Sequence, residues 1–147
     1  MLLMGATSAH ADTVRVIDGD GFELNGKVIR IWGIDAPELT QTCRNRFWWS
    51  YPCGKRSKAF LEQILQDSTP VCRTITRDKY GRLVSKCFVD GEDLAALIVR
   101  AGWAVDFTRY SGGKYAEEQA QAEAEKRGIW AGSFDMPSDV RKQGREL

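Results

Sequence analysis

Residues 13–34 read TVRVIDGDGFELNGKVIRIWGI, and this stretch decides the fold. In Thr13–Ile17 and Lys27–Ile34, β-branched or apolar side chains alternate with polar ones, which is the pattern of β-strands. The runs are separated by Asp18-Gly19-Asp20-Gly21 and by Asn25-Gly26, and Asn-Gly between such runs is a strong hairpin signal. We therefore predict that the N-terminal part of the chain is β-structure.

The rest of the chain adds helices and a second hairpin. Apolar residues at helical spacing predict three helices, over Lys55–Asp67, Glu92–Ala101 and Lys114–Arg127. Two extended runs, Val71–Thr76 and Leu83–Val89, flank a turn at Asp78–Gly81. Five short strands with intervening helices predict an α+β fold with a small barrel. A length of 147 residues favours one domain.

The two ends of the chain are predicted to lie outside this domain. Residues 1–11 contain no Asp, Glu, Lys or Arg and end in Ala9-His10-Ala11, which fits a signal-peptidase site. We interpret residues 1–11 as the remnant of an export signal, with a disordered tag as the alternative. Residues 12–131 are then the folded domain, and residues 132–147 a polar, loosely held tail. Export predicts a periplasmic or secreted protein.

Two features of the composition narrow the possible functions. His10 is the only histidine and lies in the export segment, so catalysis by a histidine general base is excluded. No apolar run approaches the ~20 residues that a membrane span needs, so no span is expected.

Basic residues are concentrated in two stretches, although the net charge is only +1. Leu39–Leu61 holds five basic residues and no acidic one, and Pro70–Val89 holds five against the single Asp78. If the two stretches share a face, that face would attract phosphate groups. The alternative is an ordinary solvated surface.

The four cysteines indicate disulfides, because an even number in a small exported chain favours them and no pair has the close spacing of a zinc site. If Lys79 and Tyr80 are the two loop residues of the second hairpin, Cys72 lies directly opposite Cys87, within reach of a bridge. The other pair is then Cys43–Cys53. The same register would place Arg77 opposite Arg82, and free buried thiols are the alternative for all four cysteines.

Three segments have residue types that suit phosphodiester chemistry. Val16–Gly21 places carboxylates at a glycine-rich strand end, a common arrangement for Ca²⁺ or Mg²⁺ ligands. Arg30–Glu38 combines an arginine, an aspartate and a glutamate, as metal-assisted hydrolysis requires. Asp78–Arg82 offers Lys, Tyr and Arg for phosphate and base contacts. Taken singly, each segment is more typical of a turn or of a solvated surface.

Together, the segments resemble the staphylococcal nuclease (thermonuclease) family. The matching strings are Val16-Ile17-Asp18-Gly19-Asp20, Arg30…Asp35-Ala36-Pro37-Glu38, Asp78-Lys79-Tyr80-Gly81-Arg82 and Gly128-Ile129-Trp130. Each string is moderately specific, and the four in order are highly specific. The resemblance runs from about Val14 to Trp130 and implies a five-stranded OB-fold barrel with three helices.

The resemblance also implies a role for each matching residue. Asp20 and Asp35 would be side-chain ligands of Ca²⁺, and the backbone carbonyl of Ala36 a third ligand. Glu38 would orient or deprotonate the attacking water. The residues implied to contact phosphate are Arg30 and Arg82 at the scissile group and Lys79 and Tyr80 at a terminal phosphate.

The implied activity is Ca²⁺-dependent hydrolysis of DNA, RNA or both by a monomeric endonuclease that leaves 3′-phosphate ends. Two other classes remain: a non-catalytic OB-fold module that binds single-stranded nucleic acid, and a calcium-stabilised structural or adhesion domain. This chain departs from the family at Gly21 and Ala36, positions that are often Thr, and in an insertion over Leu39–Gly54 that would shape substrate access. Phe107 and Tyr110 cannot be aligned onto the base-stacking positions of the family, so base preference stays open.

Overall fold

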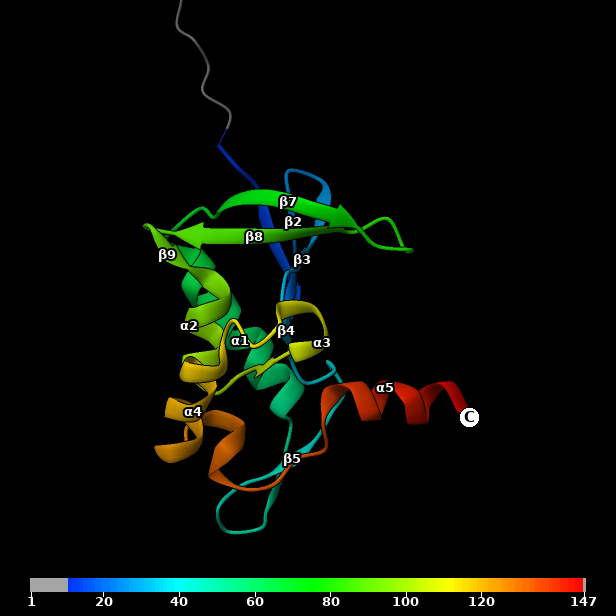
Figure 1. Ribbon diagram of the computed structural model, residues 1–147, viewed down its shortest axis with the longest axis vertical. Helices are drawn as coiled ribbons and strands as arrows, with labels where there is room; N and C mark the ends of the chain where they lie inside the picture. The colour runs from blue at the N-terminus through cyan, green and yellow to red at the C-terminus, as the bar shows by residue number, and fades with distance from the viewer. Residues whose placement is uncertain (1–10, 147) are drawn as a thin grey trace, which may run out of the picture.

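The computed structural model describes residues 11–146 of the chain (Figure 1). The export segment expected at residues 1–11 therefore lies outside the described residues, apart from Ala11. Within the described part, no helix combines the length and the apolarity that crossing a membrane would require.

The main sheet contains the five strands of the expected barrel. Their order is β1 (Val14–Asp18), β2 (Gly21–Leu24), β3 (Lys27–Ile31), β8 (Leu83–Val89) and β7 (Val71–Arg77). A short strand, β9 (Glu92–Asp93), also pairs with β8. Neighbouring strands are antiparallel except β3 and β8, which are parallel. The fold is α+β with the strand order of an OB-fold.

Two turn signals of the sequence form the hairpins that they predicted. Asn25 and Gly26, with φ values of 52° and 81°, connect β2 to β3 in the left-handed conformation that a two-residue hairpin needs. In the second hairpin Cys72 is the register partner of Cys87, and both expected disulfides, Cys72–Cys87 and Cys43–Cys53, are formed.

The pairing expected between Arg77 and Arg82 was wrong. The β7–β8 loop is one residue longer than assumed, since the Asp78 N–H donates to the Arg82 carbonyl, and Arg77 pairs with Leu83. A bulge between Thr74 and Thr76 shifts the register back before the cysteines. The two irregularities cancel, so the prediction was right at the disulfide and wrong at the turn.

Residues 11–146 form five α-helices, where three were expected. The three expected segments hold α1 (Cys53–Gln66), α2 (Leu94–Arg100) and α4 (Ala116–Ala124), and the two additional helices are α3 (Thr108–Ser111) and α5 (Pro137–Glu146). A 3₁₀ turn, η1, spans Gly128–Ala131. The tail was expected to be loosely held, but most of it forms α5, which projects from one side of the molecule (Figure 1).

Two further pairs of short strands lie outside the main sheet. The first pair is β4 (Ile34–Asp35) with β10 (Val105–Asp106), and the second is β5 (Cys43–Arg44) with β6 (Ser50–Tyr51). Apolar residues of the main sheet, including Phe22 and Ile31, pack with Leu61 of α1 and Ile98 of α2 in the main core. Along the long axis, β4 lies between the β7–β8 hairpin at one end and β5 at the other (Figure 1).

Candidate active site

The turn between β1 and β2 carries Asp20 and lies against both α1 and the segment after β4. A Cβ atom on Gly19 would be 1.9 Å from Ser57 Oγ and 2.8 Å from Ala36 Cβ, so only glycine fits this contact. The close approach lets Asp20 Oδ2 accept the Ala36 N–H at 2.8 Å. Asp20 is buried, and its carboxylate is fixed beside the residue that follows Asp35.

Arg30 extends from β3 into the same place. Its Nη1 donates to the Ile31 carbonyl at 2.7 Å and its Nη2 to the Ile34 carbonyl at 2.8 Å, so the backbone holds the guanidinium in one orientation. Nη2 lies 3.4 Å from Asp20 Oδ2 and 3.8 Å from Asp35 Oδ1. The arginine, with only 13% of its side chain exposed, therefore contacts both carboxylates that the sequence assigned to a metal.

The carboxylates in this cluster are electrostatically strained. Burial, together with the negative charge of Asp20, raises the pKa of Asp18 to about 7. Burial also raises the pKa of Asp35, and the charge of Asp20 adds to the effect, while the hydrogen bond from Arg141 opposes it. A cation near Asp20 and Asp35 would relieve this repulsion.

The donor chemistry of the site fits a hard divalent cation, although few protein ligands are available. Carboxylate oxygens are what Ca²⁺ and Mg²⁺ prefer, and Asp20, Asp35 and the Ala36 carbonyl could supply three, with water completing the shell. No group of three or more His, Cys, Asp or Glu side chains that could hold a metal occurs among the described residues. The arrangement thus suits an ion shared between protein, water and substrate.

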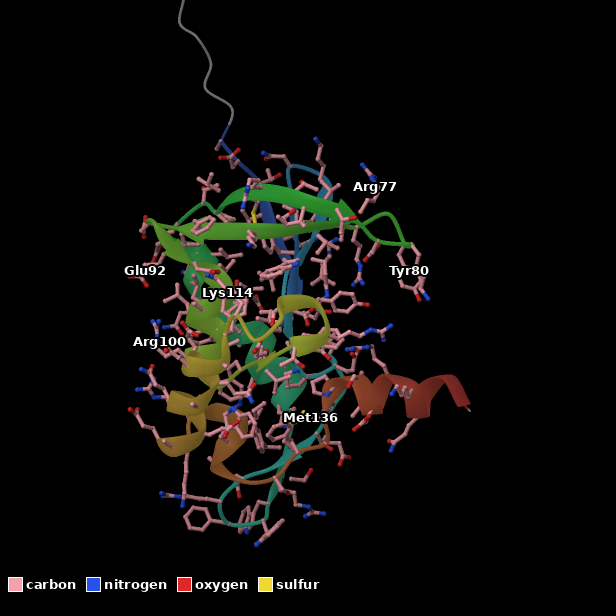
Figure 2. All side chains as sticks on the ribbon, viewed as in Figure 1. Arg77, Tyr80, Glu92, Arg100, Lys114 and Met136 are labelled. Carbon is pink, nitrogen blue, oxygen red and sulfur yellow. A yellow bond between two sulfur atoms is a disulfide. The ribbon has the colours of Figure 1, made fainter. Side chains whose placement is uncertain are left out.

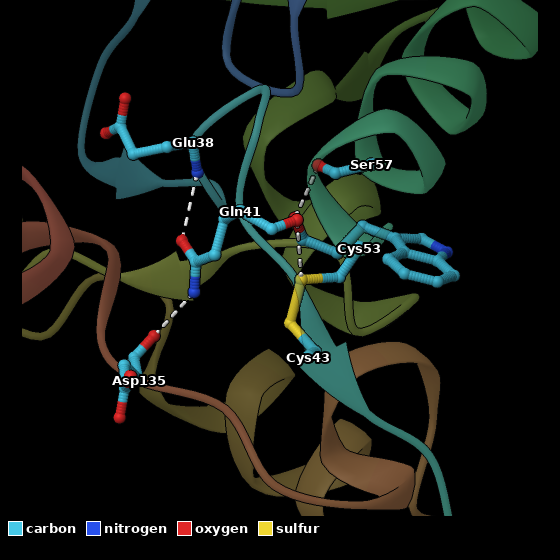
Figure 3. The surroundings of a disulfide bond; sticks show 7 residues. Glu38, Gln41, Cys43, Cys53, Ser57 and Asp135 are labelled. Carbon is cyan, nitrogen blue, oxygen red and sulfur yellow. Dashed lines mark hydrogen bonds between the residues drawn. A yellow bond between two sulfur atoms is a disulfide. The ribbon is translucent and has the colours of Figure 1, made fainter. Parts of the chain in front are cut away.

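Glu38 follows β4 in a segment that is fixed through its backbone. The Glu38 N–H donates to Gln41 Oε1 at 3.1 Å, and Gln41 Nε2 donates to the Asp135 carbonyl at 2.8 Å (Figure 3). The start of α1 packs closely on the same segment, since a Cβ atom on Gly54 would be 1.9 Å from the Glu38 carbonyl oxygen. About a third of the Glu38 side chain is exposed, so water can reach it.

Arg141 of α5 is a member of this cluster that sequence reasoning missed. Its Nη1 donates to Asp35 Oδ1 and to Glu38 Oε1, both at 2.7 Å, and its Nη2 donates to Asp35 Oδ2 at 2.9 Å. These bonds raise the pKa of the arginine, Asp35 contributing most. Pro137 and the early Asp139 are helix-start signals that could have revealed α5. Nothing in the sequence indicated that Arg141 reaches residues so far along the chain.

The other predicted site residues lie on the β7–β8 loop. Arg82 Nε donates to Asp78 Oδ2 at 2.6 Å, and the Tyr80 and Arg82 N–H groups donate to Asp78 Oδ1. Partial burial works to raise the pKa of Asp78, but the bonds from Arg82 and Tyr80 outweigh it and the pKa is lowered. Lys79 Nζ lies 5.2 Å from the Tyr80 ring centroid, and Tyr80 is exposed at the free end of the hairpin (Figure 2).

The structure therefore brings together four of the five charged residues, and Arg82 is not in contact with them. Asp20, Arg30 and Asp35 touch directly, and Arg141 connects Glu38 to Asp35. Arg82 comes two residues before Val84, the register partner of Arg30 on the neighbouring strand. The backbone of Arg82 is therefore close to that of Arg30 in the sheet. Its guanidinium, however, is paired with Asp78 and not with the cluster.

Comparison with known proteins matches residues 28–132 to the family described as "Staphylococcal nuclease homologue". The chain is 38% identical to "Succinoglycan biosynthesis protein ExoI" of Rhizobium meliloti, over 86% of this chain and 67% of that protein. It is 31% identical to "Probable endonuclease LCL3" of Schizophyllum commune, over 78% and 44%. It is 30% identical to "Endonuclease Htp3" of Saprolegnia parasitica, over 82% and 65%. The chain thus spans less than two thirds of both endonucleases.

Proposed function

The chain belongs to the staphylococcal nuclease family, and from this we propose that it is a Ca²⁺-dependent nuclease that hydrolyses phosphodiester bonds of DNA, RNA or both. The contact of Arg30 with both Asp20 and Asp35 supports this most directly. It combines a cation site with a fixed guanidinium, which are the two groups that neutralise a phosphoryl transition state. Endonuclease names among the relatives agree with the proposal.

In this proposal Asp20, Asp35 and the Ala36 carbonyl would hold a calcium ion, which would supply Lewis-acid chemistry when bound. Arg30 is oriented by two backbone carbonyls, so it can bind a phosphoryl oxygen without reorganising. Arg82 would join it after leaving Asp78.

Glu38 would accept the proton of the attacking water. The water oxygen would form a bond to phosphorus, the bond from phosphorus to the 5′ oxygen would break, and that oxygen would take up a proton from solvent. The products are a 3′-phosphate end and a 5′-hydroxyl end. Lys79 and Tyr80, exposed on the β7–β8 loop, would contact a terminal phosphate of the substrate.

One observation favours a second candidate, a non-catalytic module that binds single-stranded nucleic acid. Arg141 occupies both oxygens of Asp35 and one oxygen of Glu38. A site held permanently in this state would bind nucleic acid without cutting it.

Cleavage assays separate the two candidates. We expect the wild type to cut plasmid DNA or RNA with Ca²⁺ and to lose activity with a chelator. Glu38→Gln should lower kcat/KM by at least a hundredfold, whereas Glu62→Gln, at an exposed position on α1, should leave it unchanged. Ends that a polymerase extends only after phosphatase treatment would identify the 3′-phosphate. Binding without cleavage at every calcium concentration would favour the module.

We also propose that the protein works in an oxidising compartment, the periplasm or the extracellular space. Its two disulfides are consistent with such an environment. Fractionation of cells that express the full chain would test this, and a reduced protein confined to the cytoplasm would contradict it.

A further inference from the structure

The hairpin between β5 and β6 presents three consecutive aromatic side chains to solvent. Phe47, Trp48 and Trp49 are 65%, 68% and 74% exposed, which is unusual for such large apolar residues. Contiguous exposed apolar surface on a soluble protein commonly marks a binding site. The segment Asn45–Trp49, here called the aromatic tip, belongs to the insertion that follows Glu38.

The aromatic tip is rigid, which distinguishes it from an ordinary surface loop. Asn45 Oδ1 accepts the N–H groups of Phe47 and Trp49 at 2.9 and 3.0 Å, and the Asn45 N–H donates to the Trp49 carbonyl. The disulfide Cys43–Cys53 closes the base of the hairpin. The backbone that carries the rings is thus fixed before any partner arrives, which lowers the entropic cost of binding.

Trp48 has a strained backbone at the centre of the aromatic tip. Its φ of 65° lies in the left-handed region, where glycine or asparagine is the usual residue and a bulky side chain is an outlier. Strain of this kind persists where a function requires the side chain. The ring of Trp48 is exposed, so it does not contribute to the core in return.

The charge around the aromatic tip identifies the kind of partner. Arg44 and Arg46 belong to the β5–β6 hairpin, and the stretch Leu39–Leu61 contains no acidic residue. Arg46 lies over the Phe47 ring at 4.7 Å, and Arg44 donates to the Trp48 carbonyl, so guanidinium groups alternate with rings at the surface. Flat rings among positive charges suit a polyanion that carries stackable bases.

From these features we propose that the aromatic tip is an accessory binding site for single-stranded nucleic acid, with its rings stacked on bases and its arginines near phosphates. This deepens the proposed function and rests on it. Along the long axis β4 lies between β5, at the base of the aromatic tip, and the β7–β8 hairpin, so a strand bound at both ends would extend past the level of the candidate site (Figure 1).

The test is the affinity for a fluorescent twelve-nucleotide oligothymidine, measured by anisotropy in chelator so that no cleavage occurs. We expect Trp48→Gly and Trp49→Ala each to bind at least fivefold more weakly than the wild type. Val71→Ala, at an apolar position on β7 that is 74% exposed, is the matched control and should bind normally. Trp48→Gly should unfold at the same temperature as the wild type or higher, because glycine accepts the positive φ.

Unchanged oligothymidine affinity in both tryptophan variants would overturn the proposal. If the same variants also lose binding to vesicles of phosphatidylglycerol and phosphatidylcholine, the aromatic tip is a membrane contact instead. The cleavage assay of the wild type is independent: a wild type that cuts normally while the variants bind normally removes only this proposal.

A different observation, the position of Arg141, carries a second inference. The guanidinium binds both oxygens of Asp35, so it competes with a cation for the lone pairs and the negative charge of this carboxylate. Within residues 137–144, the side-chain hydrogen bonds from α5 to other elements all come from Arg141: two go to Asp35 and one goes to Glu38. The far end of α5 extends away from the body of the molecule (Figure 1).

We infer that α5 is a displaceable cover of the site, because Arg141 and a Ca²⁺ ion at Asp35 would compete for the same carboxylate. The inference rests on the proposed calcium dependence. Calorimetry should show that Arg141→Gln binds Ca²⁺ at least fivefold more tightly than the wild type, while Lys142→Gln, at the exposed neighbouring position, binds as the wild type does. In the wild type, trypsin should cut α5 faster with Ca²⁺ than with chelator.

Equal or weaker Ca²⁺ binding in Arg141→Gln, with trypsin cleavage that ignores Ca²⁺, would show that α5 is a permanent part of the site and would overturn the inference. A wild type and an Arg141→Gln variant that both fail to bind Ca²⁺ would instead remove the calcium dependence in the proposed function. Thermal unfolding of the variant establishes that it is folded before either result is interpreted.

Discussion

Asp18 is a residue whose ionisation lowers the stability of the metal-free protein. Its pKa is raised to about 7 by burial and by the charge of Asp20, while the unfolded chain has a value near the ordinary 3.8. Between about pH 4 and pH 7 the folded state therefore binds more protons than the unfolded state, and stability falls as the pH rises. Below pH 4 the side chain is protonated in both states and the penalty disappears.

Replacing Asp18 with Asn removes this penalty and keeps the oxygen that accepts the Asp20 N–H. We expect Asp18→Asn to stabilise the metal-free protein by about 1–3 kcal/mol at pH 8 and to have no stabilising effect at pH 4. Urea unfolding in chelator at the two pH values measures this, with Asp67→Asn, at an exposed position, as the control. A gain that is equal at both pH values would mean that ionisation is not the cause.

Arg30 depends on the shape of its guanidinium as well as on its charge. Two nitrogens bond to two different carbonyls, a geometry that a lysine ammonium cannot reproduce. We expect Arg30→Lys to lower kcat/KM by at least a hundredfold, about 3 kcal/mol in the barrier. Arg15→Lys, at an exposed ion pair with Glu23, should have no effect on activity. Near-normal kinetics in Arg30→Lys would indicate that charge alone is sufficient.

The sequence proposed a set of site residues, and the structure shows which of them are in contact. The family resemblance, and not strand periodicity, grouped Arg30 with Asp35, because the two have opposite parity along the chain. Strand parity does not apply across this segment, because Gly33, with φ of 82°, turns the chain between β3 and β4. As a result β4 pairs with β10 and not with the main sheet. The bonds of Arg141 come from a helix 106 positions after Asp35, beyond any local pattern.

The β1–β2 turn is the element whose packing determines where Asp20 lies. Alanine at Gly19 would collide with Ser57 and Ala36, so the turn would have to move away from α1 and carry Asp20 with it. We expect Gly19→Ala to cost about 1–3 kcal/mol of stability and to weaken Ca²⁺ binding in calorimetry. Gly144→Ala meets nothing within 4 Å on α5 and is the control. A variant of unchanged stability with weakened Ca²⁺ binding would show that the position of Asp20 alone determines the affinity. Normal Ca²⁺ binding would mean that the packing of Gly19 does not position Asp20 for the ion.

Helices and strands could be predicted where the sequence pattern that specifies them lies within a few neighbouring residues. The Asn25-Gly26 hairpin and the three main helices follow from turn chemistry and apolar spacing, and the structure contains them. The bulge in β7 and the longer β7–β8 loop leave no comparable signal, so the register at Arg77 could not be derived. Helix α5 was overlooked because its sequence is polar, and polar segments are predicted as helical only when their ends are examined.

Across the whole molecule, the two disulfides stabilise different regions, and only one of these regions is connected to the site. Cys72–Cys87 joins neighbouring strands of the main sheet. Cys43–Cys53 fixes the hairpin against the start of α1, where Gln41 both accepts the Gly54 N–H through its carbonyl and holds the Glu38 N–H through its side chain (Figure 3). We therefore expect loss of Cys43–Cys53 to disturb Glu38, and loss of Cys72–Cys87 to leave Glu38 in place.

Removing each bridge by a double Cys→Ala change tests this division. Both variants should lose about 2–3 kcal/mol of stability in urea unfolding, because closed loops of similar length are released in the unfolded chain. At a temperature where both are folded, Cys72→Ala/Cys87→Ala should keep the wild-type kcat/KM, and Cys43→Ala/Cys53→Ala should lose tenfold or more. An equal loss of activity in the two variants would mean that activity follows the overall stability of the protein and does not depend on the Gln41 contacts that position Glu38.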